Sequence, residues 1–270
     1  GTAQVAALTT QQVRNVLGTD HLVALGTQQI QAFSSAQIRA LTTAQTSAIE
    51  TVDLAALKTG QVAALTTQQI SGGLRTEQIV ALGTHQIQAL TSVQIQALTT
   101  DQVAAIETRD VAVLKTAQVA ALTTAQIREG LSTEQLAAFD TGQLAALTTA
   151  QIRSLTTGQV ASLETGDVAA LKAAQVAALT TEQIQYALST EQLAALGSGQ
   201  IAALTTAQIR NGLTTDQVIA LGSRQIQALT STQIQALTTM QVAVIETADV
   251  AALKPAQMSA FTTEQINLGL

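Results

Sequence analysis

The sequence predicts an all-α solenoid of very short helices, one for each eight-residue unit of a tandem repeat. Three observations predict this fold. The chain of 270 residues divides into 33 consecutive units of eight or nine residues. Each unit follows the consensus x-Thr-x-Gln-(Val/Ile)-x-Ala-Leu, numbered here as positions 1 to 8. The eight-residue period also does not match the periodicity of a long α-helix or of a β-strand.

Longer elements are excluded by the apolar positions 5 and 8. A continuous α-helix turns about 100° per residue, so its apolar stripe would drift by about 80° in each unit. In a strand, positions 5 and 8 would fall on opposite faces, because their spacings of three and five residues are odd. A long coiled coil is therefore excluded, and a simple β-solenoid fits poorly.

Each unit carries the signals of a helix start. With position 1 as the N-cap, Gln at position 4 is residue N3, and the pair forms a capping box. Leu at the end of the preceding unit and the aliphatic residue at position 5 then form a hydrophobic staple. Pro255 would lie at N1, where its missing N–H costs nothing. Capping does not explain the nearly constant Thr at position 2, which we interpret as a row of threonines between neighbouring units.

Packing between units must stabilise these helices. A helix of about six residues is only about 9 Å long and is unstable alone. Positions 5 and 8 are expected to stack into one continuous core, with the small Ala at position 7 allowing close approach. Each unit would contact mainly its neighbours, as in other solenoids. We therefore expect residues 1–270 to form a single, thin repeat array.

A longer period lies above the first. The nine-residue units are 57 residues apart, except for one interval of 25 residues; they end at Leu17, Leu74, Leu131, Leu188, Leu213 and Leu270. Residues 189–213 thus form a truncated super-repeat. The 57-residue super-repeat is either a unit of gene duplication or one superhelical turn of seven units. Both terminal units follow the consensus, which predicts an excerpt of a longer array or a protomer that joins copies of itself.

Composition excludes several classes of function. The chain has no Cys, which excludes disulfides, Cys-bearing metal sites and thiol nucleophiles. Its 12 basic residues are scattered and its net charge is −6, so we expect no binding to nucleic acid. Apolar runs are too short for membrane insertion. We find no catalytic constellation, phosphate-binding loop or cofactor motif, and predict no enzyme activity and no cofactor.

Acidic units recur once per super-repeat. Their Glu and Asp residues are the candidate cation ligands: Glu50, Asp53, Glu107, Asp110, Glu164, Asp167, Glu246 and Asp249. We interpret these pairs as helix-start residues with a weak ion pair to the Lys that follows each Glu by eight residues. A Ca²⁺ site is the alternative, but it needs more oxygen ligands than one pair supplies. His21 at position 4 and His85 at position 3 are interpreted as surface or capping variants.

The repeated Leu-Thr-Thr-x-Gln-(Ile/Val)-x-Ala-Leu, seen in residues 65–74 and 122–131, resembles the octapeptide arrays of very large secreted or surface proteins of Gram-negative bacteria. These arrays are rich in Thr, Ala and Gln, and the proteins are often labelled adhesins or haem-utilisation proteins. The resemblance implies an extracellular or cell-surface location. This chain has no matching axial His pair for haem.

The predicted function is a structural segment, acting as an adhesin stalk or as a self-assembling filament scaffold that associates end to end or laterally. The alternative is a solenoid whose concave face binds a peptide, glycan or cation. A binding face would gather the variable positions in a few units. Positions 1 and 3 vary along the whole chain, which favours the scaffold.

Overall fold

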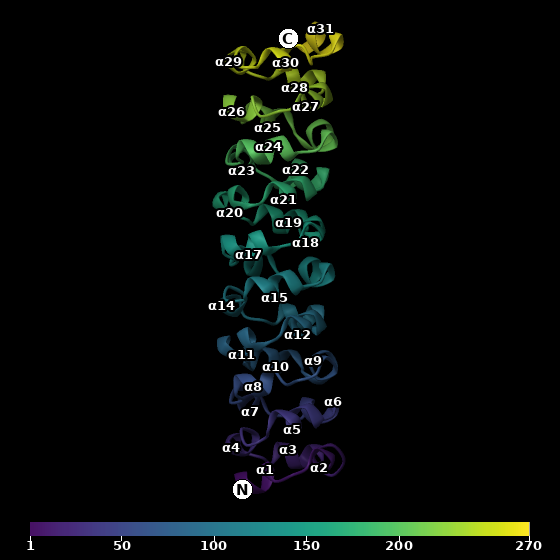
Figure 1. Cartoon of the computed structure of the whole chain (residues 1–270), viewed down its shortest axis with the longest axis vertical. Coiled ribbons are helices and arrows are strands. Elements are labelled where there is room, and N and C mark those ends of the chain that lie inside the picture. The colour runs from purple at the N-terminus through teal and green to yellow at the C-terminus, as the bar shows by residue number, and fades with distance from the viewer. Residues whose placement is uncertain (270) are drawn as a thin grey trace. The chain divides into compact units, whose positions relative to one another are not determined.

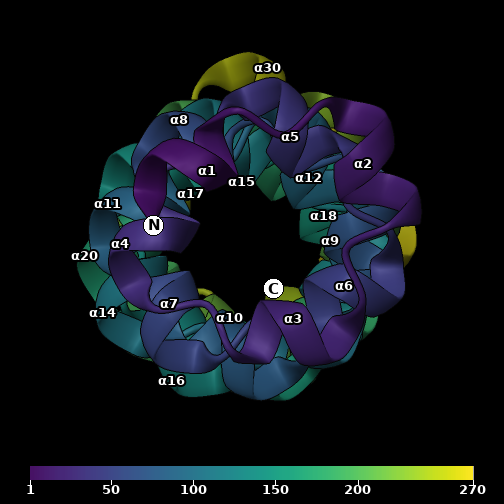
Figure 2. The same ribbon diagram turned by 90° about the horizontal axis from the view of Figure 1, so that it is seen from below.

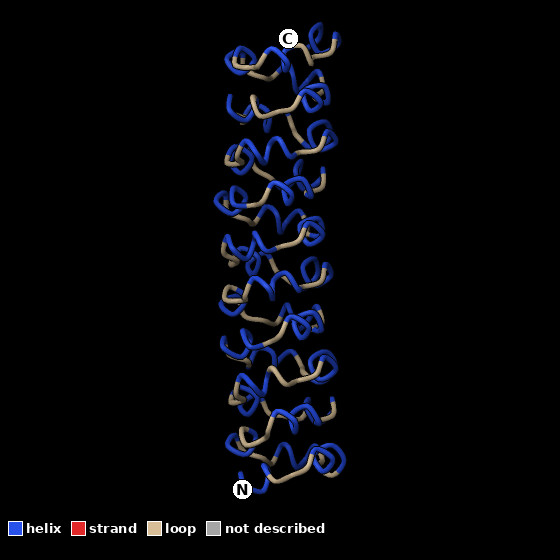
Figure 3. Tube along the Cα trace, viewed as in Figure 1, coloured by secondary structure: helices blue, strands red, loops and turns tan. Residues whose placement is uncertain are grey.

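The computed structural model describes residues 1–269 and divides the chain into two compact parts, an N-terminal half (Gly1–Ala138) and a C-terminal half (Phe139–Leu270). Each repeat unit forms one helix of four to seven residues, and the described residues contain no strand (Figure 3). The predicted all-helical solenoid, with one short helix per unit, is confirmed.

The helices of the N-terminal half are α1 (Thr2–Ala6), α2 (Thr10–Asn15), α3 (Thr19–Val23), α4 (Thr27–Ile30), α5 (Ser35–Ala40), α6 (Thr43–Ser47), α7 (Thr51–Ala55), α8 (Thr59–Val62), α9 (Thr67–Gly73), α10 (Thr76–Ala81), α11 (Thr84–Ala89), α12 (Ser92–Ala97), α13 (Thr100–Ala104), α14 (Thr108–Val111), α15 (Thr116–Ala121), the π-helix η1 (Gln126–Gly130) and α16 (Thr133–Ala137).

The helices of the C-terminal half are α17 (Thr141–Ala146), α18 (Thr149–Ser154), α19 (Thr157–Ala161), α20 (Thr165–Ala170), α21 (Ala173–Ala178), α22 (Thr181–Ala187), α23 (Thr190–Ala194), α24 (Ser198–Ala203), the π-helix η2 (Gln208–Gly212), α25 (Thr215–Ile219), α26 (Ser223–Ile226), α27 (Ser231–Ala236), α28 (Thr239–Ala243), α29 (Thr247–Ala251), α30 (Pro255–Met258) and α31 (Thr263–Gly269).

The helix starts agree with the sequence prediction. At α2, the Thr9 side chain accepts a hydrogen bond from the backbone N–H of Gln12, and the Gln12 side chain accepts one from the backbone N–H of Thr9 at 2.8 Å. Where Gly or Lys occupies position 1, the glutamine half of this box remains, as at Lys58. Pro255 lies at N1 of α30. Local capping therefore places one helix start in every unit.

Within each half the helices stack in turns. Each helix packs against the helix three further along the chain, as α1 does on α4 and α2 on α5. Figure 1 shows this order in the N-terminal half, from α1 upward, and Figure 2 shows α1, α2 and α3 following one another around a common axis before α4 returns beside α1. The same three-helix spacing recurs in the C-terminal half, where α17 packs on α20.

A turn takes between three and four units. Side chains at position 4 bond to carbonyls 28 to 33 residues earlier, as Gln45, Gln69 and Gln217 do, whereas Ser35 bonds to a carbonyl 25 residues later. Seven units therefore make two turns, and the hypothesis that seven units make one turn is wrong. The physical reason is core filling: single Leu and Ile side chains meet across a ring of three or four short helices, but a ring of seven would leave its centre empty.

Positions 5 and 8 form the core, as predicted. In α5, for example, Ile38 is fully buried and the following Leu41 is 4% exposed. Hydroxyls at position 2 lie at the contact between turns: Ser92 donates to the carbonyl of Ala117 at 3.3 Å, and Ser231 to that of Ala256 at 3.4 Å. Among threonines at position 2, Thr27 and Thr84 make such a bond, each to an Asp of a later turn. These hydroxyls thus connect units in successive turns rather than units that are consecutive in sequence.

The extra residue widens one helical turn in the five nine-residue units that lie wholly within residues 1–269. In η1, the backbone N–H of Leu131 donates to the carbonyl of Gln126, five residues earlier, and the same bond closes η2, α2, α9 and α22. This is a π-bulge. A Cβ at Gly130 would lie 3.1 Å from Cβ of Val103 in the preceding turn. A small residue is favoured at this position because the widened turn presses against an earlier helix; it is Gly in η1 and η2 and Ala187 in α22.

Candidate functional site

Buried glutamines at position 4 join successive turns. The Oε1 atom of Gln69 accepts the backbone N–H of Thr66 at 2.7 Å, which closes the cap of α9. Its Nε2 atom donates to the carbonyls of Ile38 at 2.8 Å and Leu41 at 2.7 Å, both in the preceding turn. The side chain is 2% exposed. One amide therefore orders its own helix and attaches it to the turn before.

We call this set of side chains the glutamine ladder. Its members donate from Nε2 to one or more carbonyls of an earlier turn: Gln37, Gln45, Gln61, Gln69, Gln78, Gln86, Gln94, Gln102, Gln118, Gln126 and Gln135 in the N-terminal half, and Gln175, Gln183, Gln192, Gln200, Gln208, Gln217, Gln225, Gln233, Gln241, Gln257 and Gln265 in the C-terminal half.

Sequence reasoning missed the ladder, because it gave position 4 a capping role alone. The signal was present in the choice of residue. Glu serves a capping box as well as Gln does, yet no unit of this acidic chain has Glu at position 4. A carboxylate has no N–H donors, whereas an amide has two. Constant Gln therefore indicates a second set of partners that need donors.

The acidic units invert the direction of these hydrogen bonds. Asp110 is 1% exposed and accepts a hydrogen bond from the Thr84 hydroxyl, 26 residues earlier, at 2.6 Å. The Nε2 atom of Gln88 donates to the carbonyl of Val113 at 3.0 Å. Here the earlier turn donates and the later turn accepts, the reverse of the ladder. The same pattern joins Thr27 to Asp53, Gln31 to Ala56, Ser223 to Asp249 and Gln227 to Ala252.

Asp167 is the exception among the four acidic units. It is half-buried, and its carboxylate accepts a hydrogen bond from the backbone N–H of Glu164 at 3.2 Å. The residue equivalent to Gln88 is Ala145, which has no side-chain donor. Burial raises the pKa of Asp167, the Glu164 backbone bond lowers it, and the Glu164 charge raises it further. Burial has the largest effect, so the pKa lies above its usual value of 3.8.

We expect Asp167→Gln to stabilise the protein at pH 7 by about 1 kcal/mol, because an amide gains donors and carries no charge. A raised pKa means that the folded state binds the proton more tightly than the unfolded state. The stabilising effect of Asp167 is therefore complete below pH 3.8 and is lost as the pH rises through its folded pKa. Thermal unfolding followed by circular dichroism between pH 3 and 7 should show the variant's advantage growing with pH.

Asp110→Gln is the matched control, because it removes the acceptor of a hydroxyl that is already bonded. No comparable gain is expected from this change. An equal gain in both variants, or an advantage of Asp167→Gln that does not vary with pH, would contradict the assignment.

The acidic units do not form the predicted lysine pairs. Within residues 1–269, the ion pairs closer than 4.0 Å are those of Arg109, with Glu107 and, at 3.7 Å, with Asp110. The prediction of an ion pair between each Glu and the following Lys is therefore wrong. Lys starts the next helix, which turns away around the superhelix, and solvated charges gain little from pairing. The glutamates also do not cap their helices: the side chains of Glu50, Glu107, Glu164 and Glu246 make no cap hydrogen bond.

The cation candidates stay separate. No group of three or more His, Asp or Glu side chains placed to hold a metal occurs among the described residues. Each buried Asp of the acidic units at residues 53, 110 and 249 uses an oxygen to accept a hydroxyl, as described above. The Ca²⁺ alternative required pairs from successive turns to converge, and the structure does not bring them together.

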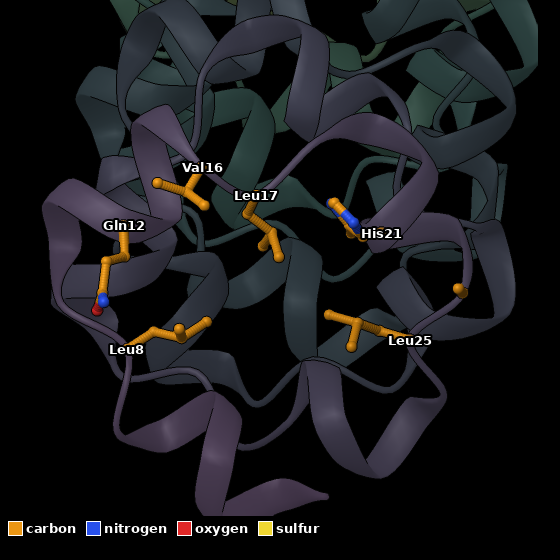
Figure 4. A pocket seen from close by; sticks show the side chains of 7 residues that line it. Leu8, Gln12, Val16, Leu17, His21 and Leu25 are labelled. Carbon is orange, nitrogen blue, oxygen red and sulfur yellow. The ribbon is translucent and has the colours of Figure 1, made fainter.

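His21 takes over the capping role of glutamine. Its Nδ1 atom accepts the backbone N–H of Gly18 at 3.0 Å. His21 lines an apolar pocket on the first turn together with Leu8, Val16, Leu17 and Leu25 (Figure 4). The residues at position 8 of the two units that follow Leu25, Phe33 and Leu41, are buried. His85 lies exposed at the start of α11. Neither histidine belongs to a metal-ligating group in the described part of the chain.

Helices stacked through buried amides, with polar side chains used in turn-to-turn bonds, define a structural protein of tandem repeats. The ALTTAQ repeat family matches the chain in ten overlapping segments, residues 15–48, 46–84, 73–106, 103–141, 129–157, 136–163, 160–194, 186–211, 211–239 and 242–268. The chain belongs to this family. No curated protein matches it at a significant level. None of the helices in residues 1–269 is both long and apolar enough to span a membrane.

Proposed function

We propose that this chain is a spacer segment of an extracellular or cell-surface protein of a Gram-negative bacterium, acting as an adhesin stalk. The observation that carries this proposal is the glutamine ladder, which repeats in turn after turn of both halves. The buried polar side chains at position 4 are used to join turns or to accept a bond from another turn. We propose no enzymatic role and no nucleic-acid partner.

The ladder suits such a role mechanically. Most helices are attached to the turn before by a buried amide, which makes three hydrogen bonds at Gln69. Hydrogen bonds shielded from water are costly to leave unmade. Adding units adds length without changing the contacts inside a turn, as in other solenoids. Without Cys, integrity does not depend on the redox state of the surroundings.

A self-assembling filament is the second form of this proposal. The repeat units present similar exposed residues at regular intervals along the chain, which would make lateral association between copies regular.

Electron microscopy of the purified chain at micromolar concentration tests the filament form. Uniform filaments would support it, and separate particles at every concentration would overturn it. The spacer itself is tested by inserting a second copy of residues 75–131, one super-repeat. Small-angle X-ray scattering should then show a longer maximum dimension at an unchanged cross-section. An unchanged maximum dimension, or a thicker particle, would contradict a spacer.

A further inference from the structure

We propose that three of the four acidic units, those of Asp53, Asp110 and Asp249, are register markers. The Asp of each marker and the donors three units earlier form a matched pair, and this pair determines which units lie against each other in successive turns. The inference rests on the proposed structural role, since the length of a spacer is defined only if every unit takes its place in the superhelix and none is looped out.

The ladder alone cannot define the register. Nearly every unit has Gln at position 4 and aliphatic residues at positions 5 and 8, so skipping one unit as an eight-residue loop would restore almost the same contacts. The π-bulges discriminate little, because their glycines lie against different side chains: Gly73 faces Thr46, Gly130 faces Val103 and Gly212 faces Ile184. A register needs a contact that only one partner satisfies.

The bond from the Nε2 atom of Gln88 to the carbonyl of Val113 is such a contact. A buried carboxylate is costly unless donors reach it, and Asp110 is satisfied by Thr84 of the same helix, α11. Because Thr or Ser stands at position 2 of nearly every unit, the amide is the part of the pair that distinguishes one unit from another. If one intervening unit were skipped, the acidic unit would lie over α10, which has Val80 in place of Gln88. Valine has no donor, so the carbonyl of Val113 would lose its partner.

The chain repeats this arrangement. The unit before the donor unit has a β-branched apolar residue at position 6 in all three copies that form the pair: Val23, Val80 and Ile219. These side chains are 44% to 49% exposed, so core packing does not account for them. In the fourth copy the pair is absent, and there the two residues are Ala145 and Ala137. The donor at position 6 of one unit and the β-branched residue at position 6 of the unit before it are therefore either both present or both absent.

The test is to replace all three pairs by the consensus residues: Asp53→Gln with Gln31→Ala, Asp110→Gln with Gln88→Ala, and Asp249→Gln with Gln227→Ala. Wild type and variant are unfolded in denaturant, refolded and compared by hydrogen exchange with mass spectrometry. We expect the variant to remain helical but to show bimodal exchange in peptides covering residues 91–106, with about a tenfold rise in the looped-out population. Gln96→Ala is the control, because this exposed position-6 side chain makes no hydrogen bond among residues 1–269.

A variant that refolds to one species with wild-type exchange would overturn the proposal. Lower stability without a second species would also overturn it, since the pairs would then contribute to stability alone. The converse variant, Ala145→Gln, installs the missing donor in the fourth copy. We expect slower exchange around residues 165–171, and unchanged exchange there would count against the pairing. These readouts report homogeneity rather than particle length, so they can fail while the spacer proposal stands.

Discussion

Gln69→Ala is expected to lower the free energy of unfolding by about 2 to 4 kcal/mol. The change removes one accepted and two donated hydrogen bonds and leaves the carbonyls of Ile38 and Leu41 without this buried donor. Urea unfolding followed by circular dichroism measures the effect.

Gln68→Ala is the control in the same helix. Gln68 is exposed, and its side chain makes no hydrogen bond within residues 1–269, so its loss should change stability by less than about 0.5 kcal/mol. Equal effects of the two substitutions would show that the ladder contributes nothing beyond helix propensity.

Gly130→Ala is expected to destabilise the protein by about 1 to 3 kcal/mol, although alanine is the better helix former. The new Cβ would lie 3.1 Å from Cβ of Val103 and 3.2 Å from the carbonyl oxygen of Thr100. Both neighbours are held in the preceding turn, so one turn must move away from the other. The melting temperature of the variant should therefore fall below that of the wild type.

Gly60→Ala separates this clash from helix propensity. A Cβ at Gly60 would meet no atom within 4 Å, so alanine should stabilise α8 by about 0.5 to 1 kcal/mol. If Gly130→Ala were stabilising to the same extent, the π-bulge would not press against the preceding turn, and its glycine would have another cause.

The helices were predictable because their signals are local. Capping boxes, staples and the eight-residue period lie within one or two units, and the observed N-caps fall at position 1, as at Thr9. The number of units in a turn was not predictable in the same way, because it depends on how many short helices surround a filled core. Residues 25 to 33 apart make those contacts, and no local pattern shows which spacing is used.

The hydrogen bonds between successive turns could be predicted only in part from the sequence. Asp110 stood out as a departure from Gln, but its partner Thr84 is one of many threonines at position 2. The partner became identifiable only once the turn size was known. The ladder was missed for a different reason. The capping box accounts for the Oε1 atom of Gln69, and no partner was predicted for the N–H donors of its amide.

Gln69→Glu tests the central claim most directly, because it keeps the capping box and removes the donors to the preceding turn. If buried amides hold the turns together, this variant at pH 7 should lose at least about 3 kcal/mol relative to Gln68→Glu, through the lost donors and a buried charge. The loss should shrink at acid pH, where a protonated carboxyl regains one donor. Equal stability of the two variants at pH 7 would mean that position 4 only caps its own helix.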